Sequence, residues 1–302
     1  MVDMRALLDL QGQLFLLALL GVLFRRRLTG ADFQQDLSTL VMDLILPCNI
    51  ITSFQTALTG DLVSRSIHVL IVSLAGQTFA FLLATVLYRR AAPDRACVMR
   101  FATLCSNAAF LGIPVVEGIW HGEGVLLATI FLLPQRFFMW SVGLGFFTSG
   151  SGRGMWKRLL TNHCIIAMMI GLVLMFTQWQ LPVPVQATIT CLSRCTTGMS
   201  MFLVGMIISQ IRRSDFLDGA VLWLTVLRLV LMPGVIWLGC RLFRIEATAA
   251  SVSVLLTAMP AGATTALLAA RYGRAEGFAA SVVTVSTLLS LLTIPLWGWI
   301  MS

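Results

Sequence analysis

Residues 106–114 read SNAAFLGIP and residues 258–265 read AMPAGATT, and each stretch interrupts an otherwise apolar segment of the chain. Proline lacks a backbone donor and clashes with the preceding turn, so each helix must bend or unwind there. Unwound backbone at membrane depth is tolerated only where it is buried in protein or lines a water-filled cavity. Paired interruptions of this kind indicate the substrate site of a secondary transporter.

The composition places most of the chain inside a membrane. Charged residues make up 11% of the 302 residues and apolar residues 58%, with a mean hydropathy of +0.90. A soluble domain carries about a quarter charged residues. The net charge is +8, but no basic stripe interleaved with aromatic residues is present to bind a nucleic acid. We therefore expect a multi-pass protein whose surroundings are the lipid bilayer, with no nucleic-acid partner.

Ten segments are long and apolar enough to be predicted as membrane spans. They lie at 7–24, 36–57, 66–88, 97–116, 123–147, 160–178, 185–209, 219–241, 247–270 and 277–300. The loops after odd-numbered spans hold fourteen Lys and Arg residues, and the opposite side holds four. Because cytoplasmic loops carry the excess of basic residues, the odd-numbered loops are predicted to be cytoplasmic and both termini to be non-cytoplasmic.

A loop rich in glycine and serine divides the chain near its middle. The predicted organisation is a first repeat at 1–148, a cytoplasmic linker at 149–159 and a second repeat at 160–302. Five spans in each half mean that the halves start from opposite faces of the membrane, as an inverted-topology repeat requires. Pro114 and Pro260 then fall in paired helices, the fourth and the ninth.

Several short motifs spread over the chain occur in the order and spacing of a known family. The most specific is Ser106-Asn107 followed by residues 110–114. The others are Leu46-Pro47, residues 203–206, Arg228-Leu229 with Pro233, Pro260-Ala261, Tyr272-Gly273, residues 286–290 and residues 293–296. Through these motifs the chain resembles a bacterial member of the auxin efflux carrier family, which includes plant PIN carriers and bacterial malate and malonate permeases.

The resemblance implies an all-α membrane fold of two inverted five-helix repeats, similar to bile-acid-transporter-like and sodium/proton-antiporter-like proteins. Helices four and nine would be broken and would cross near the midplane. It also implies an elevator-like movement of a transport domain against a scaffold, a small organic anion as substrate and a place in the bacterial inner membrane. Proteins with this fold often form dimers, so a homodimer is one assembly that the resemblance allows. Pro134-Gln135-Arg136 departs from the family pattern, and it either sets the substrate or pins the helix.

Three basic residues, Arg136, Arg194 and Arg228, lie well inside predicted spans together with one carboxylate, Asp43. A charge at mid-bilayer costs at least about 2.5 to 3.5 kcal/mol, so each should have a partner or a function. The positive surplus fits an anionic substrate, because guanidinium matches a carboxylate in two hydrogen bonds. Ion coupling or charge balance is the expected role of Asp43, Arg194 and Arg228.

Each of these charges has a structural alternative. Arg136 contacts the substrate or is buried in a structural pair with Asp43 or with helix-end carbonyls. Arg228 acts in transport or braces the helices through carbonyls freed near Pro233. Asp43 carries a coupling proton or balances an arginine.

The predicted substrate site combines the two interruptions with Arg136. Asn107 lies beside unwound backbone, where its amide contacts the ligand or an ion, or caps a half-helix. Thr264 and Thr265 begin a half-helix whose free N–H groups and positive dipole end favour an anion, although packing through small residues explains them equally well. The complete predicted set is Asn107, Gly112, Pro114, Arg136, Pro260, Gly262, Thr264 and Thr265.

Enzymes and primary pumps need residues that the predicted spans lack. Aspartyl proteolysis requires two facing carboxylates, and a serine or metal mechanism requires a partnered histidine in mid-span. Lys157 cannot complete a phosphate-binding loop, because Trp156 stands where the glycine must be. The three histidines lie near span ends: His68, His121 and His163. We expect a carrier without metal or cofactor, coupled to protons, to sodium or to neither; the alternative is a non-transporting sensor on the same fold.

Overall fold

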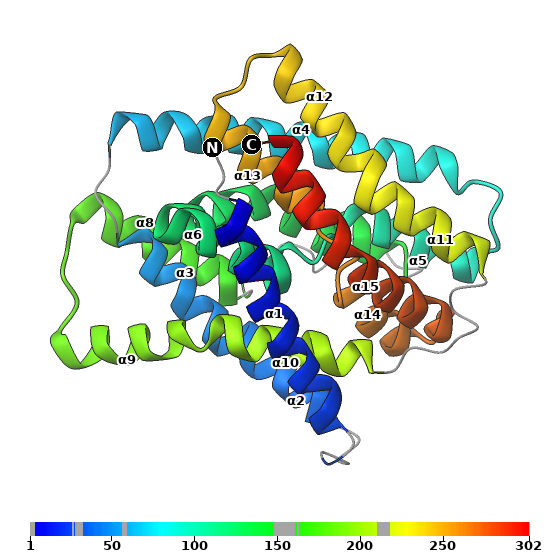
Figure 1. The fold of residues 1–302 in the computed structure, drawn as a ribbon, viewed down its shortest axis with the longest axis horizontal. Helices are drawn as coiled ribbons and strands as arrows, with labels where there is room; N and C mark the ends of the chain where they lie inside the picture. Colours follow the sequence, from blue (N-terminus) through cyan, green and yellow to red (C-terminus); the bar gives the residue numbers. More distant parts are fainter. Residues whose placement is uncertain are drawn as a thin grey trace.

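The computed structural model describes residues 4–25, 27, 33–55, 59–147, 161, 163–209 and 218–301, and within them the fold is helical except for one isolated bridge (Figure 1). The predicted linker at 149–159 lies outside these residues. In chain order, with η denoting π-helical segments, the elements are α1 (Met4–Arg25), α2 (Phe33–Leu40), η1 (Val41–Ile45), α3 (Leu46–Phe54), α4 (Gly60–Leu87), α5 (Pro93–Leu104), η2 (Ala108–Gly112), α6 (Ile113–Phe138), η3 (Met139–Gly143), α8 (His163–Thr177), α9 (Val183–Arg194), α10 (Thr196–Ile208), α11 (Gly219–Val226), η5 (Leu227–Leu231), α12 (Met232–Leu242), α13 (Ala247–Thr257), α14 (Thr264–Tyr272) and α15 (Glu276–Met301).

Five continuous helical stretches are long and apolar enough to cross a membrane. They are Phe33–Phe54, Gly60–Leu87, Ala108–Gly143, Gly219–Leu242 and Glu276–Met301, and shorter apolar helices occupy Gly12–Arg25, His163–Thr177 and Ala247–Thr257. The predicted class, an all-helical membrane protein, is therefore confirmed. The count of ten spans stays a prediction.

The predicted boundary between the fourth and fifth spans lies at a sharp turn. The spans were expected at 97–116 and 123–147, and two helical parts of α6 meet between them at His121, whose backbone is not helical (φ 52°, ψ −137°). Gly124 permits this turn, since a Cβ atom on it would lie 2.3 Å from the Val116 carbonyl oxygen. The predicted seventh span is likewise divided, into α9 and α10 at Cys195.

Three of the π-helical segments stand immediately before a proline. Pro47, Pro114 and Pro233 each occupy the first turn of the helix that follows η1, η2 or η5. A proline ring clashes with the carbonyl one turn earlier and offers no N–H to it. The wider π turn removes that clash without ending the helix. The prolines therefore shape three of the long helices without breaking them.

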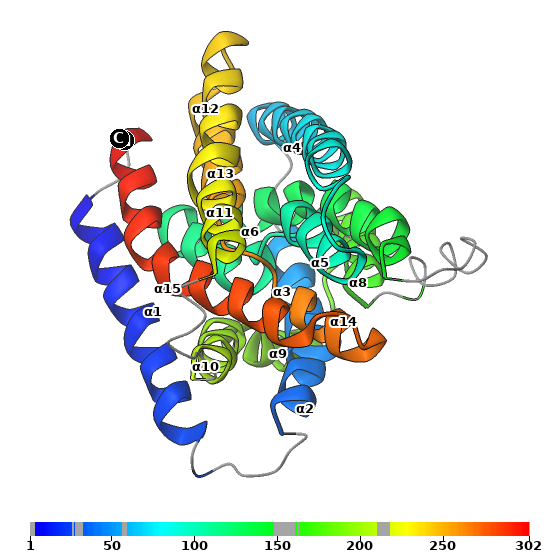
Figure 2. The ribbon, with the colours of Figure 1, turned by 90° about the vertical axis from the view of Figure 1, so that its right-hand side faces the viewer.

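The buried apolar side chains form two clusters. One gathers residues of α1, α3, α8 and α10 with parts of α4, α6 and α13, and the other gathers residues of α5, α11, α14 and α15 with the remainder of α4. The chain passes between the clusters at 105–108 and again at 259–261. Both sequence interruptions therefore lie where the two cores meet. In Figures 1 and 2, α4 and α12 lie on one side of α6, and α9 and α10 lie on the opposite side.

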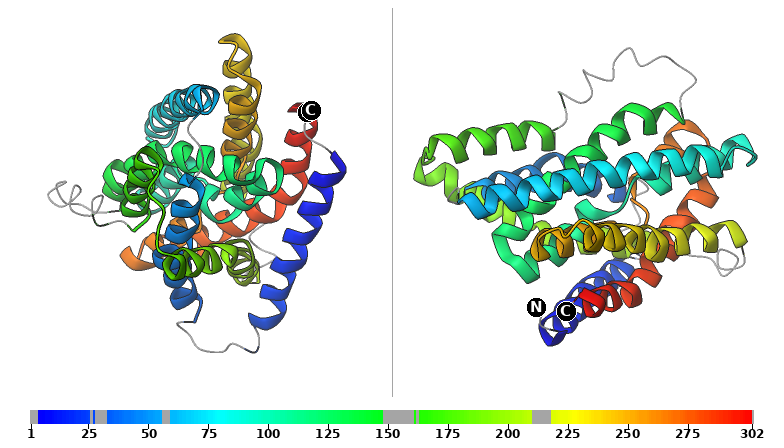
Figure 3. Two further views of the ribbon diagram at one scale, coloured as in Figure 1. Left: turned by 90° about the vertical axis from the view of Figure 1, so that its left-hand side faces the viewer. Right: turned by 90° about the horizontal axis from the view of Figure 1, so that it is seen from above.

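Helices α1 and α10 pack with their backbones in direct contact. A Cβ atom on Gly205 would lie 1.8 Å from the Ala18 carbonyl oxygen, and one on Gly21 would lie 2.1 Å from the Phe202 carbonyl oxygen. Only glycine at both positions permits this approach, which is a common way for membrane helices to associate. The end of α15 lies beside the first turns of α1 (Figures 1 and 3).

We predict that Gly205→Ala destabilises the protein, whereas Gly198→Ala, on the same helix, does not. The Gly205 methyl group would collide with backbone that cannot rotate away, and overpacking of this kind costs about 1–3 kcal/mol. A Cβ atom on Gly198 meets nothing within 4 Å, so helix propensity alone acts there and favours alanine by about 0.8–1 kcal/mol. Melting midpoints of the detergent-solubilised variants should move in opposite directions, and a shift in the same direction would contradict the packing.

Candidate functional site at the helix crossover

The two interrupted helices meet and satisfy each other's backbone. The Asn107 N–H donates to the Pro260 carbonyl at 2.7 Å, and the Gly262 N–H donates to the Cys105 carbonyl at 2.8 Å. Ser106 and Ala261 therefore form an antiparallel bridge. Buried backbone groups outside a helix need such partners. The crossing of two unwound segments supplies them, and it leaves four helix ends around one point: the ends of α5 and α13 and the beginnings of η2 and α14.

Arg228 holds the carbonyl ends of the two helices that enter the crossing. Its guanidinium is 2% exposed and donates from one Nη to the Thr103 carbonyl at 3.0 Å. The other Nη donates to the Thr257 and Met259 carbonyls at 3.2 and 3.1 Å. A cation is favourable at a helix C-terminus, where the last carbonyls lack partners. Arg228 therefore braces the crossing, and the carbonyls it binds are those of Thr103 in α5, Thr257 at the end of α13 and Met259 just beyond it, rather than carbonyls near Pro233.

Gln135 fixes the first interruption from α6. Its Nε2 donates to the Ser106 carbonyl at 2.8 Å, and its Oε1 accepts from the Ser106 hydroxyl at 2.8 Å. Gln77 of α4 donates to the same Oε1 at 3.5 Å. The second interruption is held similarly, because the Ala261 N–H donates to the Ser286 hydroxyl of α15 at 3.1 Å. Gln135 therefore ties α6 to the first interruption.

The predicted glycines and prolines shape the crossing. A Cβ atom on Gly112 would lie 2.8 Å from the Leu256 side chain, so this glycine lets η2 pack against the end of α13. A Cβ atom on Gly262 would lie 3.2 Å from the Cys105 carbonyl oxygen, in the tight contact between the two segments. Pro114 is buried in the first turn of α6, and Pro260 contributes the carbonyl that Asn107 binds.

The three predicted polar residues lie at the beginnings of η2 and α14. Asn107 is 3% exposed, makes no side-chain cap on η2 and leaves its Oδ1 without a hydrogen-bond partner. Thr265 is fully buried with an unpartnered hydroxyl, and its N–H donates to the Gly262 carbonyl at 2.9 Å. Thr264 is half-buried beside Gly262. Buried polar atoms without partners are costly and need a reason.

Arg136 follows Gln135 on α6 and is buried. It is 6% exposed, its Nη1 has no hydrogen-bond partner, and it makes no ion pair with any carboxylate in the described residues. Asp43 of η1 pairs instead with His163 at the start of α8, at 3.0 Å, and both side chains are about half exposed (50% and 56%). The predicted Arg136–Asp43 pair is thus replaced by Asp43–His163, and His163 is a partner that sequence reasoning missed.

Arg194 does not join these charges. It ends α9 with an exposed side chain and forms no ion pair within the described part of the chain. Glu117, which the span bounds left between the fourth and fifth spans, lies half-buried in α6, one turn before the turn at His121. The network around Gln135 had one signal in the sequence. This is Gln77, a polar residue within the apolar segment that forms α4.

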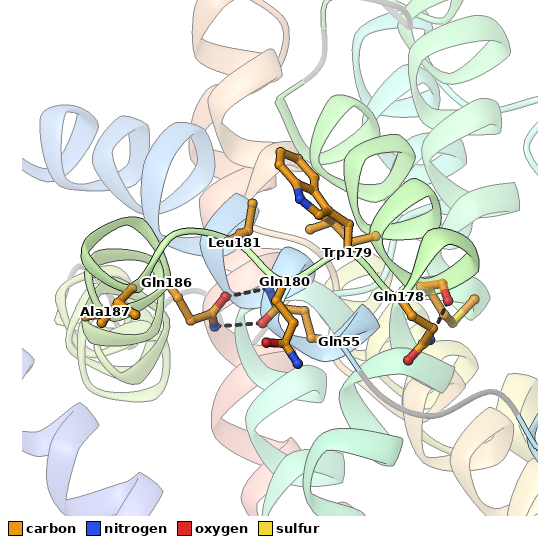
Figure 4. A pocket seen from close by; sticks show the side chains of 10 residues that line it. Gln55, Gln178, Trp179, Gln180, Leu181, Gln186 and Ala187 are labelled. Carbon is orange, nitrogen blue, oxygen red and sulfur yellow. Dashed lines mark hydrogen bonds between the residues drawn. The ribbon is translucent and has the colours of Figure 1, made fainter.

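A separate cleft of about 560 Å3 lies between the ends of α3 and α8 and the start of α9 (Figure 4). Gln55 and Gln186 exchange hydrogen bonds of 2.7 Å across it. Its other polar side chains are Gln178 and Gln180, so it presents neutral amides and no charge. None of the predicted site residues lines it. The crossover, although more tightly packed, is where the unusual backbone and the buried charges gather.

We predict that Arg228→Met destabilises the protein by several kcal/mol, because each buried carbonyl left without a donor costs about 1–3 kcal/mol. The stability of Arg228→Lys should lie between that of the wild type and that of Arg228→Met, since an ammonium reaches fewer of the three carbonyls. Arg241→Met, at an exposed position of α12, is the matched control. Melting midpoints and the yield of monodisperse protein measure the effect, and an unchanged midpoint for Arg228→Met would show that the clamp carries little stability.

Comparison with known proteins identifies the family. The model of the family described as Membrane transport protein matches residues 12–154 and 147–298. An uncharacterized transporter of Methanothermobacter thermautotrophicus is 28% identical over 293 residues, which cover 94% of this chain and 92% of the relative. A second uncharacterized transporter, from Methanocaldococcus jannaschii, is 26% identical over 208 residues, or 66% of each chain. The chain belongs to the Membrane transport protein family, the family of the auxin efflux carriers that its motifs resemble.

Proposed function

We propose that the protein is a secondary active transporter of small organic anions, with its substrate site at the crossover. The observation that carries the proposal is Arg136, a buried guanidinium with an unpartnered Nη1 and no carboxylate paired to it. Uncompensated charge inside a membrane protein is costly and marks substrate or ion pathways. A carboxylate from the substrate is the natural partner for this guanidinium.

The helix ends support the same sign of charge. Arg228 already neutralises the carbonyl ends of α5 and α13. The beginnings of η2 and α14 carry the positive ends of two helix dipoles, and no acidic side chain lies in the first turn of either. Such ends bind anions through their free N–H groups. At the crossover, Arg228 therefore neutralises the two negative helix ends, whereas the two positive ends are open to an anion.

The site residues divide into two roles under this proposal. Asn107, Thr264, Thr265 and Arg136 contact the anion, because they supply unpartnered polar atoms or lie at the positive helix ends. The frame that holds the two interruptions together consists of Gly112, Pro114, Pro260, Gly262, Gln135 and Arg228.

The transport mechanism that fits is alternating access by an elevator-type movement of one half of the fold against the other. The two hydrophobic clusters support this division, since α1, α3, α8 and α10 contribute to one and α5, α11 and α14 to the other. Ten helices in two inverted repeats would place the crossover near the midplane. The family matches, at 12–154 and 147–298, divide at the predicted linker and support two repeats. Both termini would then lie on the non-cytoplasmic side of the bacterial inner membrane.

We predict that Arg136→Gln abolishes anion binding without unfolding the protein. Removing a buried charge that has no partner also removes its desolvation cost, so the ligand-free melting midpoint should stay equal or rise. The stabilisation by the bound anion should disappear. Arg241→Gln, an exposed arginine of α12, is the control. A lower ligand-free midpoint together with retained anion binding would make Arg136 a structural residue.

We predict further that Asn107→Ala abolishes uptake in proteoliposomes while leaving the fold intact. Its backbone N–H, which holds the crossing, remains in the variant, and only the unpartnered amide is lost. Unchanged uptake would remove Asn107 from the site.

A thermal-shift screen supplies the ligand for these measurements. It compares malonate, malate, indole acetate and related mono- and dicarboxylates, with and without sodium and at several pH values. Stabilisation by one carboxylate supports the proposal, and the absence of any shift would remove the argument from Arg136. An anion that binds but does not cross the membrane would favour a non-transporting sensor.

A further inference from the structure

A cavity lined by two arginines lies where three helices begin or end. It has a volume of about 270 Å3 and is bounded by the end of α12, the start of α13 and the last residue of α15. Its lining includes Arg241, Arg244, Trp237 and Ser251 together with apolar side chains, and none of its lining residues is acidic. The turn between α12 and α13 lies at the edge of the fold (Figure 1). The cavity therefore presents positive charge at the surface of the molecule.

Two candidate membrane spans end at this cavity. Gly219–Leu242 carries Arg241 in its last turn, and Glu276–Met301 contributes Met301 to the lining. The end of a span marks the level at which the hydrocarbon of the bilayer gives way to headgroups. The cavity therefore lies at headgroup level, on the side of the membrane that is predicted to be non-cytoplasmic.

Neither arginine of the cavity is paired with a carboxylate. Arg241 and Arg244 form no ion pair in the part of the chain that the structure describes. Glu246, the acidic residue nearest in sequence, is engaged elsewhere: it accepts from the Ala249 N–H at 2.8 Å and pairs with Arg65 at 3.5 Å. The predicted non-cytoplasmic side holds only four basic residues. Two unpaired arginines at one point on that side run against the usual distribution of charge, and they indicate an anionic ligand.

Local structure holds both side chains at the cavity. The Arg241 guanidinium lies over the ring of Trp237, 5.2 Å from its centroid, a contact that orients the cation and supplies no acceptor to its N–H groups. Arg244 has a positive φ of 50° in the turn that ends α12, where the Ile245 N–H donates to the Cys240 carbonyl at 2.9 Å. Glycine is the usual residue in such a turn. An arginine that accepts this backbone strain indicates a function for its side chain.

The surroundings of the cavity fit a lipid better than a soluble anion. Leu238, Leu242 and Phe243 are next to the arginines in sequence and are 63%, 75% and 76% exposed. Large apolar side chains exposed at the end of a membrane span are suited to contact with acyl chains. The cavity itself is too small for a whole phospholipid, so it takes the headgroup while the acyl chains stay outside. A phosphate group accepts strong hydrogen bonds from guanidinium groups.

We propose that this cavity binds the phosphate of an anionic phospholipid, with Arg241 and Arg244 as the donors. Basic pockets between membrane helices bind anionic headgroups in this way. The lipid joins the ends of α12 and α15 to the start of α13 at one membrane surface. The site depends neither on the crossover nor on transport, so a failure of the proposed function leaves it unaffected. Variants of Arg241 remain suitable controls for Arg136 and Arg228 in neutral detergent free of phospholipid, because the cavity then has no ligand to lose.

The first test adds phosphatidylglycerol or phosphatidylcholine to the purified full-length protein in neutral detergent and counts bound lipids by native mass spectrometry. The wild type should retain one phosphatidylglycerol in preference to phosphatidylcholine. The double variant Arg241→Gln/Arg244→Gln should lose this occupancy several-fold, whereas Arg90→Gln, an exposed arginine beyond the end of α4, should keep it. Lipid-free melting curves check that both variants are folded. Equal retention of the two lipids, or undiminished phosphatidylglycerol on the double variant, would overturn the proposal.

Inorganic phosphate distinguishes a lipid from a soluble anion. Phosphatidylglycerol should raise the melting midpoint of the wild type, and inorganic phosphate at the same concentration should neither raise it nor displace the lipid. A shift with inorganic phosphate that equals the lipid shift and is lost in the double variant would assign the cavity to a soluble anion instead.

The variant Arg244→Gly separates lipid binding from folding. Glycine relieves the strain of the positive φ, so the melting midpoint of the lipid-free protein should rise. The further increase produced by phosphatidylglycerol should become smaller, because one phosphate donor is lost. A lower lipid-free midpoint together with the full lipid shift would make Arg244 a structural residue and would overturn its assignment as a donor.

Discussion

The satisfaction of backbone carbonyls at the ends of α5 and α13 is the constraint on which the rest of this structure depends. These helices stop inside an apolar core, where their last carbonyl groups have neither helix nor water to donate to them. Arg228 supplies three hydrogen bonds, and the crossing of 105–107 with 260–262 supplies two more. Because Arg228 comes from η5 and Gln135 from α6, the interruptions fix the arrangement of helices that are far apart in sequence.

The binding of Arg228 to the carbonyl ends gives the crossover an asymmetric distribution of charge. Four helix ends meet there, and a resident cation faces only the two negative ones. The two positive ends meet buried side chains whose oxygen atoms have no partner, at Asn107 and Thr265. Proteins rarely leave such groups unpartnered without a function. The same asymmetry is the reason that different consequences are predicted for removal of Arg228 and of Arg136: the first charge binds backbone carbonyls, and the second is the proposed partner of the anion.

Features that depend on local chain chemistry could be predicted from the sequence, and features that depend on long-range side-chain pairs could not. The prolines indicated the interruptions, because proline fixes φ and lacks an N–H donor in any context. The gap predicted between the fourth and fifth spans likewise contains the sharp turn at His121. Asp43 and His163 are 120 positions apart, and nothing in either neighbourhood of the sequence indicates the other. The role of Gln135 could not be predicted either, because its hydrogen bond to Ser106 depends on the fold. In the sequence, the charge of its neighbour Arg136 was the more evident feature.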